Sequence, residues 1–500
     1  MSRALLTRLR KGFHLDSVAL MRIARTVSEL DGIEDAALMM GTSTNLEILA
    51  DAGLLDGEGK TAQGGDLVIA IAGMDSDAAA RGLAGADALL DGPGDIAVTN
   101  NGWRPRSLRG AVTVMPEANL ALISVPGDFA AAEARKAIRR GLHVMIFSDN
   151  VSLADEVDLK REAQALRRLV MGPDCGTAII AGVPLAFANR VPRGGIGIVG
   201  ASGTGIQEVS SLIARHYGGV SHAIGVGGRD LHSEVGGIST LMALDALDRD
   251  VATQHVVLIS KPPPCGVAKI VLERVSRFTK PVTICFVGAG EMDMPANVHQ
   301  VRTLRDAAIT SLGQSVPASH PQVSVIGTRE HQTYSRGLFM GGTLAAEAQA
   351  VFLAAGLPIS SNVPVPGAEV MNGAKETGRN LILDLGADAF TKGRPHPMID
   401  PVARDAAVTE ALRDDTVGVV LVDLVVGHGA HPNPAQSLAE AVAIIPEAGR
   451  PVVVASVTGT DADPQVRSIQ VATLEAAGIS VAPTSADAAE WAARAVGAKF

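Results

Sequence analysis

Short runs of Val, Ile and Leu recur along the chain, each followed by glycine or another turn residue and then by a helical pattern. The runs do not alternate between apolar and polar residues, which is typical of strands covered on both faces. Alternation of strand and helix predicts parallel βαβ winding with right-handed crossovers, and therefore an α/β fold. Ligands of such folds bind outside the carboxyl ends of the strands. The runs span residues 66–72, 120–125, 143–147, 195–199, 223–226, 256–259, 282–287, 323–326, 381–385, 417–422, 452–455 and 480–482.

The composition agrees with several parallel sheets. A chain of 500 residues suits about three domains of roughly 150 residues each. Hydrophobic residues make up 47% of the chain, and 54 glycines with only 3% aromatic residues indicate an aliphatic core with many tight turns. A net charge of −10 argues against a nucleic-acid partner. It does not exclude an anionic small ligand, because backbone amides can hold phosphate in an acidic protein.

The cysteines and the N-terminus indicate a cytoplasmic protein. Cys175, Cys265 and Cys285 are too few and too scattered for a disulfide framework or a zinc cluster, so no metal site is expected. Residues 1–24 are basic and amphipathic but lack the long apolar segment of a secretory signal. No run reaches the ~20 apolar residues of a membrane helix, so no membrane partner is expected either.

The segment GIGIVGASGTGIQEV is the first candidate for an anion site. Its GxGxxG spacing is formal only, because these glycines lie within and just beyond a strand rather than on the following turn. Ser202, Gly203 and Thr204 are better placed, since they follow the strand and open a helix. Unpaired amides and the helix dipole would favour phosphate there. The alternative is an ordinary helix cap.

A second candidate lies where the strand at 417–422 leads into GHGAHPNP. Gly427 and Gly429 would let the backbone approach a ligand closely. His428 and His431 could act as acid, base or oxyanion donor, or could simply cap local carbonyls. A two-histidine metal site is disfavoured, because no Cys, Asp or Glu lies at short spacing to complete it.

Several single residues at strand ends are weaker candidates. Cys175 has no histidine close in sequence to activate it, so a buried structural thiol is favoured over a nucleophile. Arg229 could bind a carboxylate or phosphate, or pair with Asp230. Lys261 and Lys392 could face a ligand or only solvent.

Several motifs resemble one known superfamily. MGPDCGT, GIVGASGTGIQEV and AIGVGGRD, in this order, resemble the α subunit of succinyl-CoA synthetase, as does the preceding ISVPGDFAAAEARKAIRRGLHVMIFSDNVS. NLILDLGADAFTKGRPH, VGVVLVDLVVGHGAHPNP and RPVVVASVTGTDAD resemble the carboxyl-terminal ligase domain of its β subunit. The fusion of both on one chain resembles the FdrA family, and the resemblance covers roughly residues 35–495.

The resemblance implies a domain order. A helical extension over 1–34 would precede a Rossmann-like CoA-binding domain over 35–191 and a flavodoxin-like ligase domain over 192–318. A connection over 319–375 would lead to a second ligase domain over 376–500. The resemblance also implies that Ser202–Gly203–Thr204 and Gly427–His428–Gly429 begin two helices facing one phosphate site. The implied CoA or nucleotide pocket is lined by Gly41, Thr42, Ser43, Asn45, Pro126, Ser148, Asn150 and Pro173.

The sequence also departs from the synthetase pattern. The loop that carries the family's phosphorylated histidine in a GHAGA-type motif reads FVGAGEMDMPANVHQ, and His299 nearby lacks that pattern. Lys261 replaces an expected acidic residue. The ~60 residues between the two ligase-like regions are too few for an ATP-grasp domain. Such a chain would not run the whole synthetase cycle alone.

Three functions remain open on this basis. The first is the FdrA-type subunit of an oxamate carbamoyltransferase of purine and allantoin catabolism. The second is an acyl-CoA synthetase component whose ATP is handled by another subunit, with His428 or His431 carrying the phosphoryl group. The third is a non-catalytic regulatory subunit. Carbamoyl phosphate or another acyl phosphate, a carboxylate, CoA and partner subunits of a hetero-oligomer are the expected ligands and partners, with no tightly bound cofactor. In the carbamoyltransferase, Ser202, Gly203 and Thr204 would hold phosphate, and Lys261 would stabilise it as it leaves. Arg229 or Lys392 would bind the substrate carboxylate, and His428 or His431 would transfer the proton or polarise the carbonyl.

Overall fold

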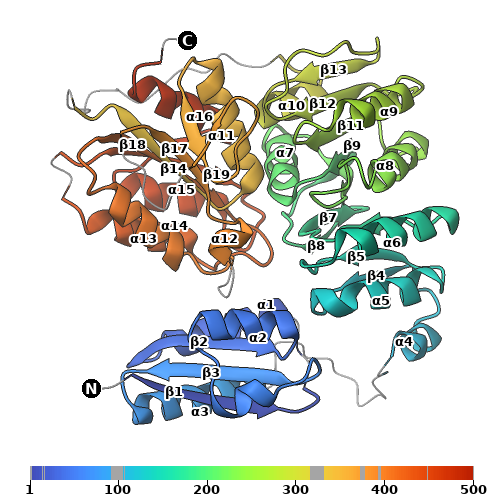
Figure 1. The fold of residues 1–500 in the computed structure, drawn as a ribbon. Helices are drawn as coiled ribbons and strands as arrows, with labels where there is room; N and C mark the ends of the chain where they lie inside the picture. The colour runs from blue at the N-terminus through green and yellow to red at the C-terminus, as the bar shows by residue number, and fades with distance from the viewer. Residues whose placement is uncertain are drawn as a thin grey trace. The chain divides into compact units, whose positions relative to one another are not determined.

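The computed structural model describes residues 3–13, 15, 17–91, 105, 107–315, 331–371, 378–391, 396–446 and 449–498. The chain divides into two compact units (Figure 1). One comprises Met1–Asp155 with Asp388–Pro395, and the other comprises Glu156–Ala387 with His396–Phe500.

The first unit begins with a three-stranded antiparallel sheet of order β1-β3-β2. The central strand β3 is buried along its whole length, with one apolar cluster on each face. Helices α1 and α3 cover one face, and α2 contributes to the other. The elements are β1 (Ala4–Arg10), α1 (Ser17–Ser28), β2 (Ile33–Met40), α2 (Ser43–Asp51), a 3-10 helix (Gly57–Thr61), β3 (Leu67–Gly73) and α3 (Ser76–Asp91).

This sheet differs from the helical extension expected over 1–34. Leu6 in β1 packs on one apolar cluster, whereas Leu5 and Leu9 pack on the other. That alternation is the period of a strand, so β1 pairs with β3 instead of forming a helix. The unit continues with α4 (Leu108–Val114), the parallel strands β4 (Leu120–Ile123) and β5 (His143–Ile146), and the intervening α5 (Gly127–Ile138).

The second unit holds two seven-stranded sheets. The order of the first is β13-β12-β11-β9-β10-β7-β8, in which β9 to β13 are parallel and the β7–β8 hairpin is antiparallel. Counted from β9, the parallel strands have the flavodoxin-like order 2-1-3-4-5. This part of the chain comprises α6 (Leu153–Ala165), which spans the unit boundary, β6 (Val170–Met171), β7 (Thr177–Ile180), β8 (Val183–Ala186), β9 (Arg193–Gly200), α7 (Gly203–Arg215), β10 (Val220–Gly225), α8 (Ile238–Arg249), β11 (His255–Ser260), α9 (Cys265–Val275), β12 (Val282–Phe286), β13 (Val298–Val301) and α10 (Leu304–Ser311).

The second sheet is parallel throughout and has the order β16-β15-β17-β14-β18-β19-β20. When β15 and β16 at the edge are left out and the other strands are numbered from β14 along the chain, the order is again 2-1-3-4-5. Thus β14 and α11 hold the places that β9 and α7 hold in the first sheet. The elements are β14 (Tyr334–Phe339), α11 (Gly342–Ala354), β15 (Ile359–Ser361), β16 (Glu369–Val370), β17 (Asn380–Asp384), α12 (Asp388–Thr391), α13 (Val402–Ala411), β18 (Val417–Val425), α14 (Pro434–Ala443), β19 (Val452–Thr458), α15 (Arg467–Ala476), β20 (Ser480–Ala482) and α16 (Ser485–Ala495).

The expected α/β fold with parallel, flavodoxin-like sheets is therefore confirmed, but the connection expected over 319–375 is not what the structure shows. That stretch contains β14 and α11, and β14 is a central strand of the second sheet. The strand expected at 323–326 lies outside the described residues.

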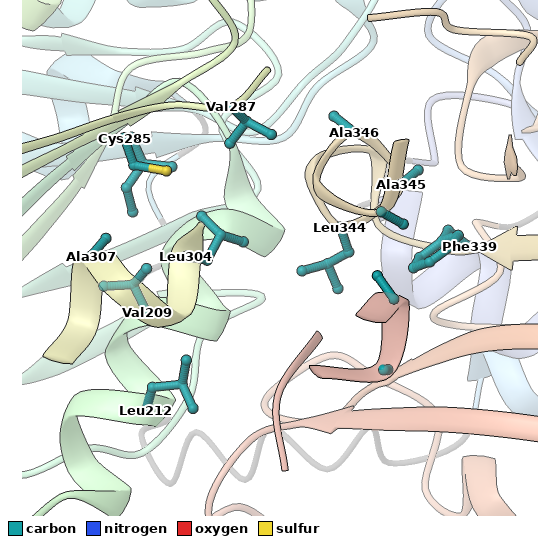
Figure 2. Packing of buried hydrophobic residues seen from close by; sticks show 14 of the residues in the cluster. Val209, Leu212, Cys285, Val287, Leu304, Ala307, Phe339, Leu344, Ala345 and Ala346 are labelled. Carbon is teal, nitrogen blue, oxygen red and sulfur yellow. The ribbon is translucent and has the colours of Figure 1, made fainter. Parts of the chain in front are cut away.

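One apolar core joins the two sheets of the second unit. Helices α7 and α10 of the first sheet contact α11 and α16 of the second. Val209 and Leu212 from α7, Leu304 from α10 and Leu344 from α11 belong to a single buried cluster (Figure 2). Each sheet thus presents to the other the helix that follows its first parallel strand and the helix that follows its last. This packing fixes the relative position of the two strand edges at which ligands are expected.

Candidate functional site

The helices α7 and α11 begin against each other. Ser202 caps α7, and its side chain accepts a hydrogen bond of 3.2 Å from the amide of Gly205. The hydroxyl of Thr343, in the first turn of α11, donates a hydrogen bond to the hydroxyl of Ser202. A Cβ atom at Gly341 would lie 3.0 Å from Thr204, so the two first turns are in direct contact.

This contact lies at the carboxyl ends of β9 and β14, where the strand order of each sheet reverses. The first amides of an α-helix have no partner within the helix and carry the positive end of its dipole. Two such ends side by side favour an anion that both can reach. The Ser202 and Thr343 hydroxyls are two further donors at the same place.

The predicted first loop lies at this junction, and a loop that was not predicted, before α11, contacts it there. Ser202 is hydrogen-bonded by Thr343, Thr204 lies against Gly341, and Gly203 lies against Thr177. The signal for the second loop was present in FMGGTLAAEAQ, which repeats the order of apolar strand, glycine, hydroxyl residue and helix found in VGASGTGIQEV.

Residues 427–429 are packed against and hydrogen-bonded to other parts of the chain. The amide of Gly427 donates to Oε1 of Gln465 at 3.0 Å, and the amide of His428 donates to the carbonyl of Ala188 at 3.0 Å. A Cβ at Gly429 would lie 2.5 Å from the ring of Phe187. Close packing of residues 187–189 accounts for these glycines, and the phosphate role of Gly427 and Gly429 stays a prediction.

Replacement of Gly429 by alanine is expected to destabilise the fold by about 1–3 kcal/mol. Its φ of +85° is unfavourable for a side chain, and the new Cβ would meet Phe187. Denaturant unfolding measures the change. Gly266→Ala is the matched control, because Gly266 lies in α9 with no atom within 4 Å of the added Cβ. Equal stability of the two variants would contradict the packing role.

The two histidines of this loop are both hydrogen-bonded. Arg190 Nε donates to Nε2 of the half-buried His428 at 3.3 Å. The buried His431 accepts a bond of 3.0 Å at Nδ1 from the amide of Asn433, and its own amide donates to the carbonyl of Met398. Each ring thus has one nitrogen without a proton. Roles for these rings in proton transfer stay predictions.

The predicted basic residues differ in their surroundings. Lys261 is exposed and follows β11, the strand beside β9, so it lies at the same sheet edge as Ser202. Arg229 does not pair with Asp230, since its guanidinium lies 2.9 Å from Oε2 of Glu156. Lys392 lies outside the described residues. Of the two described residues, Lys261 is the one that lies at the edge where β9 ends, and the described structure gives its side chain no partner.

The residues predicted to bind CoA or a nucleotide mostly serve local structure. Thr42 caps α2, and Asn45 donates to the carbonyl of Met40. Ser148 donates to the carbonyl of Val125, which places this buried hydroxyl beside the turn of Pro126. Of the others, Gly41 packs on residues 62–63, Ser43 and Asn150 are exposed, and Pro173 is buried in the second unit. A CoA pocket at these residues stays a prediction.

Burial decides the role of Cys175. The thiol is fully buried, and burial raises its pKa to about 12. A thiol with such a pKa holds almost no thiolate at neutral pH. This agrees with the structural role favoured from the sequence.

Asp423 is a residue that the sequence interpretation missed. Its carboxylate accepts bonds from the amides of Met340 at 2.6 Å and Gly341 at 2.9 Å, immediately before α11. Burial raises the pKa of Asp423 to about 7 despite these bonds. A Cβ at Gly342 would lie 2.6 Å from Oδ2 of Asp384, so a second carboxylate lies at this turn. An aspartate within the apolar run VGVVLVDLV was the available signal.

Three protein-family models match the chain. A CoA-ligase model matches residues 338–495, a CoA-binding-domain model matches 193–288, and a model for the heavy metal-associated domain of AllF matches 1–101. The CoA-binding match falls on the sheet of β9 to β12, not on the region 35–191 where a CoA-binding domain was expected. Where the CoA-binding domain lies in this chain therefore stays open. The residues that the CoA-ligase model matches are largely those of the second sheet.

One relative spans almost the whole chain. The uncharacterised protein YahF of Escherichia coli strain K12 is 40% identical over 489 residues, which cover 94% of this chain and 95% of YahF. The chain belongs to the same family as YahF, within the succinyl-CoA synthetase superfamily. This confirms the resemblance to the FdrA family that the motifs indicated.

More distant relatives match only part of this chain. The α subunit of the ADP-forming succinate–CoA ligase of Staphylococcus epidermidis is 28% identical over 150 residues, which is 29% of this chain and 48% of that subunit. This chain thus spans about half of that relative. Among solved structures, acetyl-coenzyme A synthetase 1 of Candidatus Korarchaeum cryptofilum, in complex with phosphate and ADP, is 16% identical with a TM-score of 0.34 over 75% of this chain and 82% of the other. A superposition at that score supports no conclusion about the site.

The N-terminal match raises the question of a metal. The matched residues 1–101 contain no cysteine, the usual ligand of soft heavy metals. In the part of the chain that the structure describes, no three His, Cys, Asp or Glu side chains are grouped to hold a metal ion. The residues of this family member therefore do not fit a heavy-metal site. Likewise, no helix among those described is long and apolar enough to cross a membrane.

Proposed function

We propose that this YahF-family protein is the acyl-transferring component of an acyl-CoA ligase, and that it binds an acyl phosphate where α7 and α11 begin. The contact between the Ser202 and Thr343 hydroxyls carries the proposal, because it brings two helix N-termini to one place. The CoA-ligase and CoA-binding family models support it. ATP would be handled by a partner subunit.

The proposed reaction needs donors that the starts of the two helices and Lys261 supply. The thiolate of CoA attacks the acyl carbon, a thioester forms, the bond between the acyl carbon and the phosphate oxygen breaks, and phosphate leaves with the electron pair. Ser202 and Thr343 would turn their hydroxyls from each other to the phosphate oxygens. First-turn amides and Lys261 at the same edge would stabilise the charge on the leaving group.

Carbamoyl transfer, the first function considered from the sequence, uses the same leaving group. It would also need a site for a carboxylate such as oxamate. Arg229, one predicted ligand, is paired with Glu156. The family models favour CoA chemistry, so carbamoyl transfer is a competing outcome of the same experiment rather than the proposal.

An acyl phosphate as substrate tests the proposal, because it bypasses the ATP step. The purified chain with acetyl or succinyl phosphate and CoA is expected to form thioester and phosphate in equal amounts. Ser202→Ala should lower the rate about 100-fold. Ser276→Ala is the control, since this exposed serine lies at the end of α9. Turnover of carbamoyl phosphate with oxamate, without thioester from the acyl phosphates, would favour the carbamoyltransferase instead.

A further inference from the structure

Helix α7 lies along the carboxyl edge of the second sheet. At its start, Thr204 contacts Gly341, which follows β14. One turn on, the carboxylate of Glu208 accepts bonds from the hydroxyl of Thr458, the last residue of β19, and from the amide of Ser485, which follows β20. Ligands of such folds bind at this edge, so the α7 residues that face it are in position to form a binding site.

The same face of α7 continues beyond Glu208 to Ser211 and Arg215. Residues three or four apart are neighbours on a helix surface, and these two follow Glu208 at steps of three and four. Ser211 is 0% exposed, and its hydroxyl has no hydrogen-bond partner among the described residues. Nη1 of the half-buried Arg215 is also buried and has no partner there. Buried polar groups in folded proteins are hydrogen-bonded, so these two donors indicate a ligand.

A third donor comes from the loop after β19. Arg467, the first residue of α15, donates from Nε to the carbonyl of Val457 at 2.8 Å. Val457 precedes Thr458, to which Glu208 is bonded, so this guanidinium lies at the strand end that α7 crosses. Burial, and then the positive charge of Arg215, lowers the pKa of Arg467 to about 10, which agrees with two guanidinium groups at one place.

The carboxylates near Arg215 have partners of their own. Asp461 accepts a bond of 2.7 Å from the amide of Ser468, and Asp487 lies 2.6 Å from Nη1 of Arg305. Within the described ranges of the chain, no carboxylate lies within ion-pair distance of the Arg215 guanidinium or of its neighbour on α15. Two guanidinium groups without such a counter-ion favour a bound anion.

We propose that Ser211, Arg215 and Arg467 form a second anion site, which takes a phosphate-type oxyanion. Donors from three side chains suit a tetrahedral oxyanion, which presents acceptor oxygens on all sides, better than a planar carboxylate. Ser202 and Arg215 lie at opposite ends of the 13-residue helix α7, about 20 Å apart. One small anion cannot reach both ends, so this site is separate from the proposed acyl-phosphate site and does not depend on it.

Calorimetric titration of the full chain with sulfate counts the sites. The unchanged protein is expected to bind two equivalents of sulfate. Arg215→Gln should weaken one of them by about tenfold or more and leave the other unchanged, because a charged donor is lost at one end of α7 only. Arg249→Gln is the matched control and should change neither, since Arg249 ends α8 as Arg215 ends α7 but is exposed.

Ser211→Ala is a second variant, and it removes a hydroxyl that has no partner among the described residues. It should therefore leave the fold intact and weaken the same equivalent as Arg215→Gln. Acetate tests the class of ligand. It should bind this site about tenfold or more weakly than sulfate, because it offers fewer acceptor oxygens. Equal affinity for acetate would make this a carboxylate site and contradict the proposal.

The outcomes separate this inference from the proposed function. A single equivalent of sulfate that Ser202→Ala removes and Arg215→Gln retains would overturn the second anion site. A single equivalent with the opposite response would keep the second anion site and contradict the acyl-phosphate site. If no sulfate binds, both sites are wrong.

Discussion

Lys160→Met is expected to lower the free energy of unfolding by about 3–5 kcal/mol, one of the largest effects of a single substitution in this chain. The ammonium group is fully buried, 2.8 Å from Oε1 of Glu156 and 2.7 Å from Oδ1 of Asp230. Methionine would fill the space but leave two buried carboxylates without their shared cation. Asp230 also accepts bonds from the amides of Ser239 and Thr240, so the start of α8 should loosen as well.

Urea unfolding of the full chain measures the effect. Lys136→Met is the matched control, because Lys136 pairs with Glu133 on the surface of α5 and its side chain is 55% exposed. Its removal should change stability by less than about 1 kcal/mol. In Lys160→Met, Arg229 still pairs with Glu156 and offsets part of the loss of stability. A change in Lys160→Met no larger than in the control would show that the buried network contributes little.

The fold of the second unit could be predicted where strands are apolar throughout. The apolar runs at 256–259 in β11 and at 417–422 in β18 are buried, and the sequence predicts both. Strand β14 was missed because Ser335 and Arg336 interrupt its apolar run. Both are buried, and Arg336 is satisfied by the carbonyl of Arg379 and by Asp414. Partners more than 40 residues away cannot be read from local sequence.

The candidate site shows the same limit. A turn after an apolar strand correctly indicated a helix start at Ser202, because a helix N-terminus follows from local sequence. The glycines at 427 and 429 gave an equally strong local pattern, yet they serve close packing by Phe187 and Ala188. Glycine marks a close approach of some atom, and only the structure shows which atom it is.

Thr343→Val should lower both sulfate affinity and thioester formation by about 10- to 100-fold. The substitution keeps the shape that packs against Gly205 but removes the hydroxyl that reaches Ser202. Thr343→Ser keeps the hydroxyl and should retain most of the activity. Calorimetric titration with sulfate and the acyl-phosphate assay measure the two effects.

The comparison with His428→Ala decides which loop completes the site. His428 accepts a bond from Arg190, and its amide is bound to Ala188, so its loss should change sulfate affinity by about twofold or less. Thioester formation should be equally insensitive if the histidine carries no proton in the reaction. If sulfate affinity and thioester formation fall more in His428→Ala than in Thr343→Val, the loop after β18 forms the second half of the site. The reverse order would support a second half at the start of α11, where the hydroxyl of Thr343 reaches Ser202.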